Sequence, residues 1–246
     1  MMKYLRCSND ILPLFSYLGS QYMVKSLLFR NKGQINVVKN CAMITWGPSI
    51  MIGGDFSKTM CEILNAKLQN SDGCRYIYCP AGEWESFVAN SFAKSLTRKQ
   101  IMLYHHIEQC KNSGQAEHIF QISESWLNRN LPNSQLIKNE IYSYKTIEDF
   151  LQNGFGLALV VDNTVCGYCL SEYGIDNECA INIWVVEKFR NLGYAKTMTR
   201  LFLQYSKEKN WNVFWACDAD NLPSNKVAQS SGFVIHSKQN YFEWRK

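Results

Sequence analysis

The sequence lacks an apolar run long enough to cross a bilayer. A membrane-spanning helix needs about 20 consecutive apolar residues, and no stretch of the 246-residue chain approaches this. The apolar segment at residues 11–18 is short, Asp10 precedes it, and no small-residue cleavage site follows it. We therefore expect no secretory signal and no membrane partner, and we predict a cytoplasmic protein.

Charged residues are scarce at 19% of the chain, whereas apolar residues make up 46%. A disordered chain would have the opposite balance. The formal net charge of +5 comes from residues 1–130, because basic and acidic residues balance from Leu131 onward. No run of Lys and Arg is interleaved with aromatic residues, so nucleic acid is not an expected partner. The composition predicts a globular chain with one large domain or two small ones.

Neither a disulfide framework nor a metal site is indicated. Four of the ten cysteines fall within predicted strands: Cys166, Cys169, Cys179 and Cys217. A small buried thiol is ordinary in a strand, and the Cys166-x-x-Cys169 pair does not open a helix as redox pairs do. His105, His106 and Cys110 have no second ligand pair at zinc spacing. We expect reduced thiols and no metal.

The first half of the chain predicts a small α/β unit, which we place at residues 1–125. Apolar spacing favours helices over residues 1–30 with a break near Gly19, from a Ser57 cap to about residue 68, and over 83–93. Short strands are expected at 35–38, 41–46, 50–55, 77–79 and 99–104. The polar stretch 110–131 contains the expected junction, and no internal repeat is visible.

The second half, residues 126–246, has a more regular α/β pattern. A helix at 147–152 precedes strands 156–162 and 165–174, which a turn at Asn163-Thr164 joins into a hairpin. Further strands are expected at 178–186, 211–218 and from Phe233, with helices from about 194 to 209 and from 225 to 231. The fold class is therefore α/β (α+β).

The strand at 178–186 alternates between two faces. Cys179, Ile181, Ile183 and Val185 form an apolar face that suits packing under a helix. The other face carries a carboxylate, an amide and an indole, which suit a lined cleft: Glu178, Asn182 and Trp184.

Small residues mark the turn that follows this strand. Gly193 and Ala195 let a ligand approach the backbone where the first N–H groups of a helix have no internal partner. Such a helix start binds phosphate, although an ordinary strand-to-helix turn looks the same. The turn lacks the Lys-Ser/Thr of a nucleoside-triphosphatase loop and is not G-x-G-x-x-G.

The order of these pieces resembles the GNAT-type N-acetyltransferases. The family pattern Gln/Arg-x-x-Gly-x-Gly/Ala is matched by Arg190, Gly193 and Ala195. The pattern Asn-x-x-Ser…Ala-x-x-x-Gly-Phe is matched by Asn221, Ser224, Ala228, Gly232 and Phe233. The run Trp215-Ala-Cys-Asp218 with Asn221 is similar to the group that includes zwittermicin A resistance proteins. The resemblance covers about residues 150–233.

This resemblance implies a C-terminal GNAT fold, a mixed twisted sheet flanked by helices, and acetyl-CoA as cosubstrate. The pyrophosphate would lie on the backbone from Arg190 to Lys196, and the pantetheine would pair with the last strand residues. The implied cofactor-binding residues are Val185, Val186, Arg190, Asn191, Leu192, Gly193, Tyr194, Ala195, Lys196, Asn221 and Ser224.

Direct acetyl transfer needs a base, because a free primary amine is protonated near neutral pH. Glu178 is the expected base, with Asn182 beside it, and Glu187 is the runner-up. A solvated strand-end Glu is the competing interpretation of Glu178. Many family members carry a tyrosine as acid four residues before the last glycine, where this chain has Ala228. Tyr194 and Tyr173 are the other hydroxyls considered.

The expected function is N-acetylation of a small amine or an amino-acid-like acceptor, with antibiotics included. Two alternatives remain: a peptide or protein N-acetyltransferase, and a non-catalytic acyl-CoA sensor. The turns at 46–48, 53–55 and 79–84 are interpreted as ordinary turn chemistry or as lining of a substrate pocket. The sequence leaves open whether the chain forms a homodimer.

Overall fold

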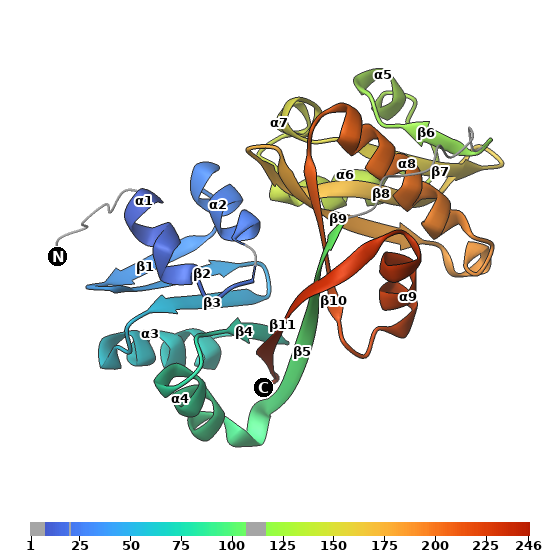
Figure 1. Ribbon diagram of the computed structural model, residues 1–246. Coiled ribbons are helices and arrows are strands. Elements are labelled where there is room, and N and C mark those ends of the chain that lie inside the picture. The colour runs from blue at the N-terminus through green and yellow to red at the C-terminus, as the bar shows by residue number, and fades with distance from the viewer. Residues whose placement is uncertain (1–7, 20, 107–116) are drawn as a thin grey trace. The chain divides into compact units, whose positions relative to one another are not determined.

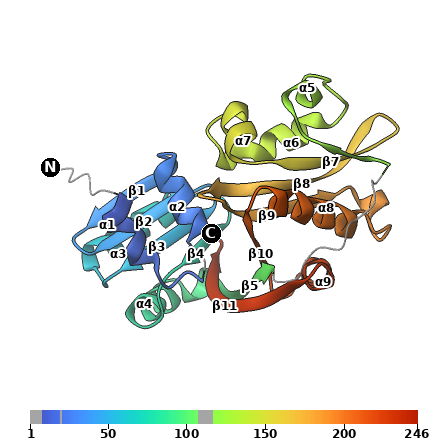
Figure 2. The same ribbon diagram turned by 45° about the horizontal axis from the view of Figure 1, so that its top comes forward.

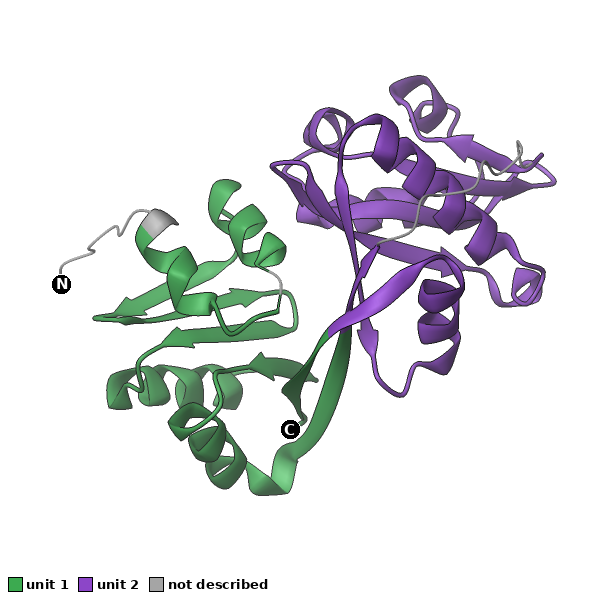
Figure 3. Ribbon diagram, in the orientation of Figure 1, with its two compact units in different colours: residues 1–102, 237–246 green, residues 103–236 purple. Residues whose placement is uncertain are grey.

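A computed structural model describes residues 8–19, 21–106 and 117–246 of the chain, which forms two compact units (Figures 1 and 3). Unit 1 comprises residues 1–102 and 237–246, and unit 2 comprises residues 103–236. The strands β5 (Leu96–His106) and β11 (Phe233–Trp244) each contribute residues to both units. The limits 1–125 and 126–246, which the sequence suggests for separate domains, stay a prediction.

Unit 1 is an α/β layer structure. Its strands follow the order β1-β2-β3-β4-β11. Before β5, its elements are α1 (Ser8–Ile11), the 3-10 helix η1 (Leu12–Phe15), α2 (Tyr22–Phe29), β1 (Gln34–Val38), β2 (Cys41–Trp46), β3 (Ser49–Gly54), α3 (Lys58–Gln69), β4 (Arg75–Tyr78), α4 (Glu83–Ser91) and η2 (Ala93–Ser95). Figure 1 shows α1 and α2 on one side of β1–β3, with α3 and α4 on the other.

The alternation of β2 explains the two layers of unit 1. Met43 and Cys41 point to the face covered by α3, where they pack with Leu64 and Ile52. Between them, Ala42 points to the opposite face and is fully buried too. Because both faces are covered, β2 is apolar without interruption over its buried part, as a central strand must be.

The strands of unit 2 follow the order β5-β10-β9-β8-β7-β6. Its elements are β6 (Ile119–Gln121), α5 (Glu124–Leu127), α6 (Ser134–Glu140), η3 (Ile141–Ser143), α7 (Ile147–Asn153), β7 (Gly156–Val161), β8 (Thr164–Ile175), β9 (Glu178–Val185), η4 (Glu187–Phe189), α8 (Tyr194–Glu208), β10 (Asn212–Asp218) and α9 (Leu222–Ser230), followed by β11.

Two tight turns set the register of the β7–β8–β9 meander. Asp162 and Asn163 both have positive φ, 48° and 58°, as do Asp176 and Asn177, at 47° and 60°. Consecutive positive φ values define the type I′ turn, whose twist matches that of paired antiparallel strands. Figure 2 shows α5, α6 and α7 on one face of this meander and α8 on the other.

The two units repeat one order of elements, although the sequence shows no repeat. In each, three antiparallel strands lead into a helix, and the next strand lies parallel to the third: β3 with β4, and β9 with β10. A second helix and a last strand complete each series. The last strands are exchanged, because β11 pairs with β4 of unit 1 and β5 lies next to β10 of unit 2.

Most of the expected elements are present at the expected places. Ser57 does cap α3, accepting a hydrogen bond from the Met60 N–H at 3.3 Å. The mixed, helix-flanked sheet confirms the expected fold class. Boundaries differ slightly: the hairpin turn is at Asp162-Asn163, and α9 begins at Leu222, because Asn221 is its cap. The predicted features at Cys110 lie outside the described residues.

Candidate active site

The loop before α8 presents an uncapped helix start. Gly193, the N-cap residue, has φ of 85° and no side chain that could accept a hydrogen bond from the first turn. The N–H groups of Tyr194, Ala195 and Lys196 are among those that a helix cannot satisfy internally. Since α8 has 15 residues and no acidic residue in its first turn, its dipole favours an anion here.

The rest of this loop leaves its backbone accessible. Asn191 has φ of 62°, and the Leu192 side chain is 64% exposed. A Cβ added at Gly193 would meet no atom within 4 Å. The predicted phosphate-binding residues from Arg190 to Lys196 thus form one continuous turn around the helix start.

The strands β9 and β10 separate next to this turn. Their parallel pairing covers Asn212–Phe214 opposite Glu178–Ala180 and ends there. Both strands continue beyond it, β9 to Val185 and β10 to Asp218. The backbone of β9 from Ile181 onward therefore has an edge that pairs with β10 nowhere in the described chain, and an extended ligand can add to such an edge.

The hydrogen bonds at the end of β9 distinguish Val185 from Val186. The Val186 N–H donates to the Cys166 carbonyl at 2.8 Å, so it faces β8. Because backbone groups alternate along an antiparallel strand, the N–H and carbonyl of Val185 point to the separated edge. Arg190 confirms this direction, since its Nε donates to the Val185 carbonyl at 2.9 Å.

The loop between β10 and α9 is held by its own side chains. The Asn221 Oδ1 accepts from the Ser224 N–H at 3.2 Å, and the Ser224 Oγ accepts from the Trp215 Nε1 at 3.1 Å. Asn225, which the sequence analysis did not single out, donates to the Asp218 and Asn221 carbonyls at 3.0 and 2.8 Å. Asn221 and Ser224 therefore shape this loop, and direct contact with a ligand stays a prediction for them.

A hydroxyl lies beside α9 although Ala228 provides none. Tyr104 of β5 is buried and hydrogen-bonds to the Asn225 Oδ1, which also accepts from the Cys217 thiol at 3.4 Å. Burial raises the pKa of both the Tyr104 hydroxyl and the Cys217 thiol. A thiol with a raised pKa is a poor nucleophile, which agrees with the expectation that Cys217 is an ordinary buried strand thiol.

The sheet face under α6 is aromatic and polar. We define the α6 face as Tyr168 and Glu172 of β8 with Asn182 and Trp184 of β9, which lie on one side by register. The Tyr168 and Trp184 rings stack at 5.8 Å. The Asn182 Nδ2 donates to Glu140 Oε2 of α6 at 3.0 Å. Glu140 is 42 residues away in sequence, and no motif pointed to it.

A second carboxylate lies on the same face. The Tyr142 hydroxyl donates to Glu172 Oε1 at 3.2 Å. Burial, with a smaller contribution from the negative charge of Glu140, raises the pKa of the Glu172 carboxyl to about 7. Carboxyls with such a pKa are typical of proton-transfer sites.

The remaining predicted catalytic side chains lie apart from the α6 face or at its limits. Glu178 begins β9, opposite Ile175 and Asn212, seven residues and about 23 Å of strand before Val185. Tyr194 contacts the Phe189 ring at 6.4 Å. Tyr173 is buried with φ of 54°, and its N–H donates to the Ser143 hydroxyl.

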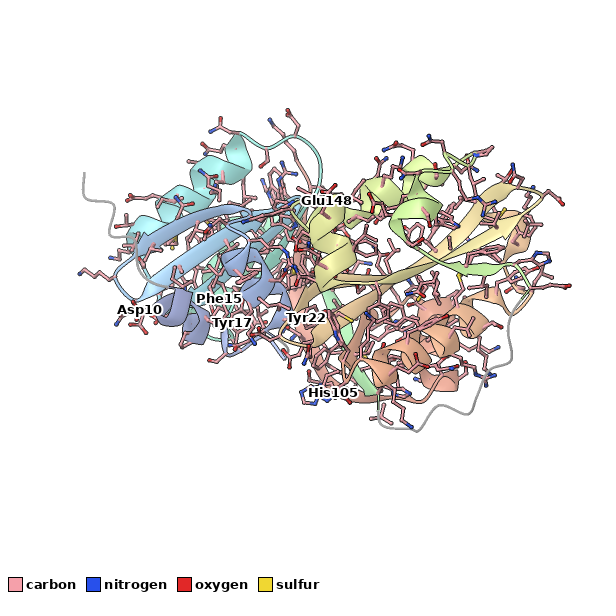
Figure 4. The ribbon with its side chains drawn as sticks, turned by 90° about the horizontal axis from the view of Figure 1, so that it is seen from above. Asp10, Phe15, Tyr17, Tyr22, His105 and Glu148 are labelled. Carbon is pink, nitrogen blue, oxygen red and sulfur yellow. The ribbon has the colours of Figure 1, made fainter. Side chains whose placement is uncertain are left out.

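Two histidines lie on β5 and β11. His105 of β5, labelled in Figure 4, stacks on His236 of β11 at 4.0 Å and meets the Phe214 ring edge-on at 4.8 Å. Burial, followed by the charge of His236, lowers the pKa of His105. Among the residues that the structure describes, no three His, Cys, Asp or Glu side chains gather as a metal site. No helix of the described ranges is long and apolar enough to cross a membrane.

Comparisons with known proteins show the family of the chain. The family model described as GNAT acetyltransferase matches residues 13–242. The uncharacterized N-acetyltransferase YdfB of Bacillus subtilis (strain 168) is 29% identical over 90 residues. That match spans 37% of this chain and only 34% of the relative.

Solved structures share the fold. A GCN5-related N-acetyltransferase-like protein from Streptococcus suis 89/1591 superposes with a TM-score of 0.72 at 18% identity, over 97% of this chain and 98% of that one. A tandem GNAT protein from the clavulanic acid biosynthesis pathway gives 0.59 at 10% identity, over 96% and 93%. Because the family model covers both units, the chain belongs to the GNAT acetyltransferase family, whose members are acyltransferases that use acetyl-CoA.

Proposed function

We propose that this protein is an acetyl-CoA-dependent N-acetyltransferase that transfers the acetyl group directly to a small cationic amine. One observation carries the proposal: the uncapped start of α8 lies beside the separated edge of β9. The first binds phosphate, and the second binds an extended amide chain. Pantetheine pyrophosphate is a ligand that needs both.

In this proposal the pyrophosphate lies on the N–H groups from Gly193 to Lys196. The pantetheine runs along the edge of β9 from the loop toward Ile181. The Val185 N–H faces this edge and donates to the part of the pantetheine next to the loop. The Ile183 N–H faces the same edge farther along β9 and donates to the thioester carbonyl as its charge develops. The Val186 N–H already donates to the Cys166 carbonyl, so in this proposal Val186 makes no backbone hydrogen bond of its own to the pantetheine.

The α6 face supports a cationic acceptor. The Glu140 and Glu172 carboxylates attract an ammonium group, and the partly buried Trp184 ring, which Tyr168 supports by stacking, is an aromatic partner for a cation. The amine must lose a proton before its nitrogen attacks the acetyl carbon and the C–S bond breaks. A carboxylate near this nitrogen takes the proton directly or through one water.

Glu140 is the base that the geometry favours. Asn182, which holds it, is one residue and about 3 Å of strand from Ile183, at the thioester end of the ligand. Glu178, which the sequence favoured, is more than twice as far along β9. In this proposal Asn182 is a positioning residue, and Glu172, whose pKa of about 7 lets it exchange protons near neutral pH, is the second carboxylate.

Steady-state kinetics with a panel of small amines test this assignment. Glu140→Gln should lower kcat at least about 100-fold, the usual effect of losing a general base, while the Kd for CoA is unchanged. Glu208→Gln, at the exposed end of α8, is the matched control. A loss of kcat in Glu178→Gln but not in Glu140→Gln would return the role of base to Glu178.

Two finer questions belong to the same experiment. Turnover with amino-acid-like antibiotics would support membership of the zwittermicin A resistance group. Thermal stabilisation by acetyl-CoA with no turnover on any amine or peptide would favour a sensor instead, which the missing hydroxyl at Ala228 supports. Absence of any stabilisation by CoA contradicts the proposed function altogether.

A further inference from the structure

Unit 1 contains a polar pocket that the acetyltransferase site does not use. Its volume is about 480 Å³, which is in the range of small-molecule sites. It lies between the C-terminal part of α3 and the start of β1, and its lining includes Gln34, Asn36, Thr45, Lys67 and Arg75.

The pocket lies where the apolar packing between α3 and the sheet ends and polar side chains begin. Gln34 pairs with Thr45 across β1 and β2, on the face that α3 covers. Farther along this face, Met43 and Leu64 pack in the core of unit 1. Beneath the end of α3 the small Ala66 side chain and polar strand residues replace that packing.

Two buried oxygens in this pocket have no hydrogen-bond partner in the described chain: Asn36 Oδ1 and Thr45 Oγ1. Polar atoms with so little contact with solvent are nearly always hydrogen-bonded in folded proteins. The amide oxygen can only accept, so it requires an O–H or N–H donor. A ligand with a hydroxyl or amide hydrogen would satisfy it.

Two cations of the pocket are held in place by neutral groups. The Lys67 ammonium donates to the Gln34 Oε1. Arg75 donates from Nε to the Ser71 hydroxyl at 3.1 Å and from Nη1 to the Cys74 carbonyl at 3.0 Å. Within the described residues, no carboxylate forms an ion pair with either cation. Burial lowers the pKa of Lys67, an effect that a bound anion would oppose.

We propose that this pocket binds a small organic anion that carries a hydroxyl or amide hydrogen. The anionic group lies between Lys67 and Arg75, while the hydrogen donor reaches Asn36 and Thr45. Ile50 and Ile63 offer an apolar surface to the carbon skeleton between them. A phosphate ester and a hydroxy acid share this chemistry.

Isothermal titration calorimetry at low ionic strength tests the site with sn-glycerol 3-phosphate and L-malate, each with and without CoA. At least one probe should bind at one site per chain, more tightly than inorganic phosphate or glycerol, and CoA should not compete. The two probes distinguish a phosphate ester from a carboxylate. Competition by CoA would place the anion at α8 and overturn the proposal.

Variants locate the binding. Lys67→Gln should weaken the bound probe at least 10-fold, and Thr45→Val several-fold. Lys58→Gln, on the exposed first turn of the same helix, removes the same charge and should leave Kd unchanged. Binding of neither probe, or equal weakening in Lys67→Gln and Lys58→Gln, contradicts the site. Since Lys67 is part-exposed, its variant stays informative if Thr45→Val misfolds.

Discussion

The helices α3 of unit 1 and α8 of unit 2 occupy the same place in the repeated order, but they begin differently. Ser57 caps α3 through its own hydroxyl, and Asp55 lies two residues before the cap. Gly193 begins α8 without a side-chain cap, and Lys196 lies in the first turn. One helix start is satisfied within the chain, whereas the other presents N–H groups to an anion.

The parallel strand pairs beside these helices also differ, in how far their pairing extends. In unit 1 the pairing of β3 with β4 extends to Tyr78, the last residue of β4. In unit 2 both β9 and β10 continue past the point where their pairing ends. The same order of elements therefore contains parallel strands paired to the end of β4 in unit 1 and separated strand ends in unit 2. The topology alone does not indicate function.

We expect the largest effect from a substitution at Gly193, which should remove the difference between the two helix starts. Gly193→Val forces a β-branched residue into positive φ and puts a side chain where the backbone should meet pyrophosphate. We expect CoA binding to weaken at least about 100-fold, or about 2.7 kcal/mol, measured by calorimetry.

The chain offers a matched control for this substitution. Gly73 of unit 1 has φ of 77° and, like Gly193, no atom within 4 Å of an added Cβ. Gly73→Val imposes comparable backbone strain and should leave the Kd for CoA unchanged. Equal weakening in both variants would mean that strain rather than position controls binding.

A second, smaller effect concerns pH. Because burial raises the pKa of Glu172 to about 7 against 4.5 in the unfolded chain, unfolding releases a proton between these values. Stability should therefore fall by about 2.5 kcal/mol as pH rises from 4.5 to 7. In Glu172→Gln this fall should be absent, as measured by urea unfolding across the pH range.

Glu62→Gln replaces an exposed carboxylate of unit 1 and provides the comparison for Glu172→Gln. It should retain the fall in stability that the unchanged chain shows. If Glu172→Gln retains it as well, Glu172 is not the carboxyl that holds the proton in the folded chain.

We expect the smallest effect from a substitution at Ser57, the cap of α3 in unit 1. Ser57→Ala removes the cap of α3 and should lower the free energy of unfolding by about 1 kcal/mol, measured by chemical denaturation. CoA affinity should not change. A change in CoA affinity would show that the start of α3 takes part in the acetyl-CoA site.

Local signals in the sequence were sufficient for the elements and for the helix-start loop. The Ser57 cap, the alternation along β9 and the Gly193 turn each depend on neighbours within a few residues. The proposed acceptor site on the α6 face could not be predicted in this way. Glu140 meets Asn182 across 42 residues, and Asn225 holds its loop through contacts that no motif encodes.

The sequence by itself determined the GNAT resemblance, the α/β class and the turn that starts α8, because glycine positions and apolar alternation act locally. Tertiary structure alone decided the rest. It showed the repeated order, since the two units share topology without visible sequence similarity. It also set which carboxylates lie on the α6 face and that Val185 rather than Val186 faces the open edge, because pairing partners choose those directions.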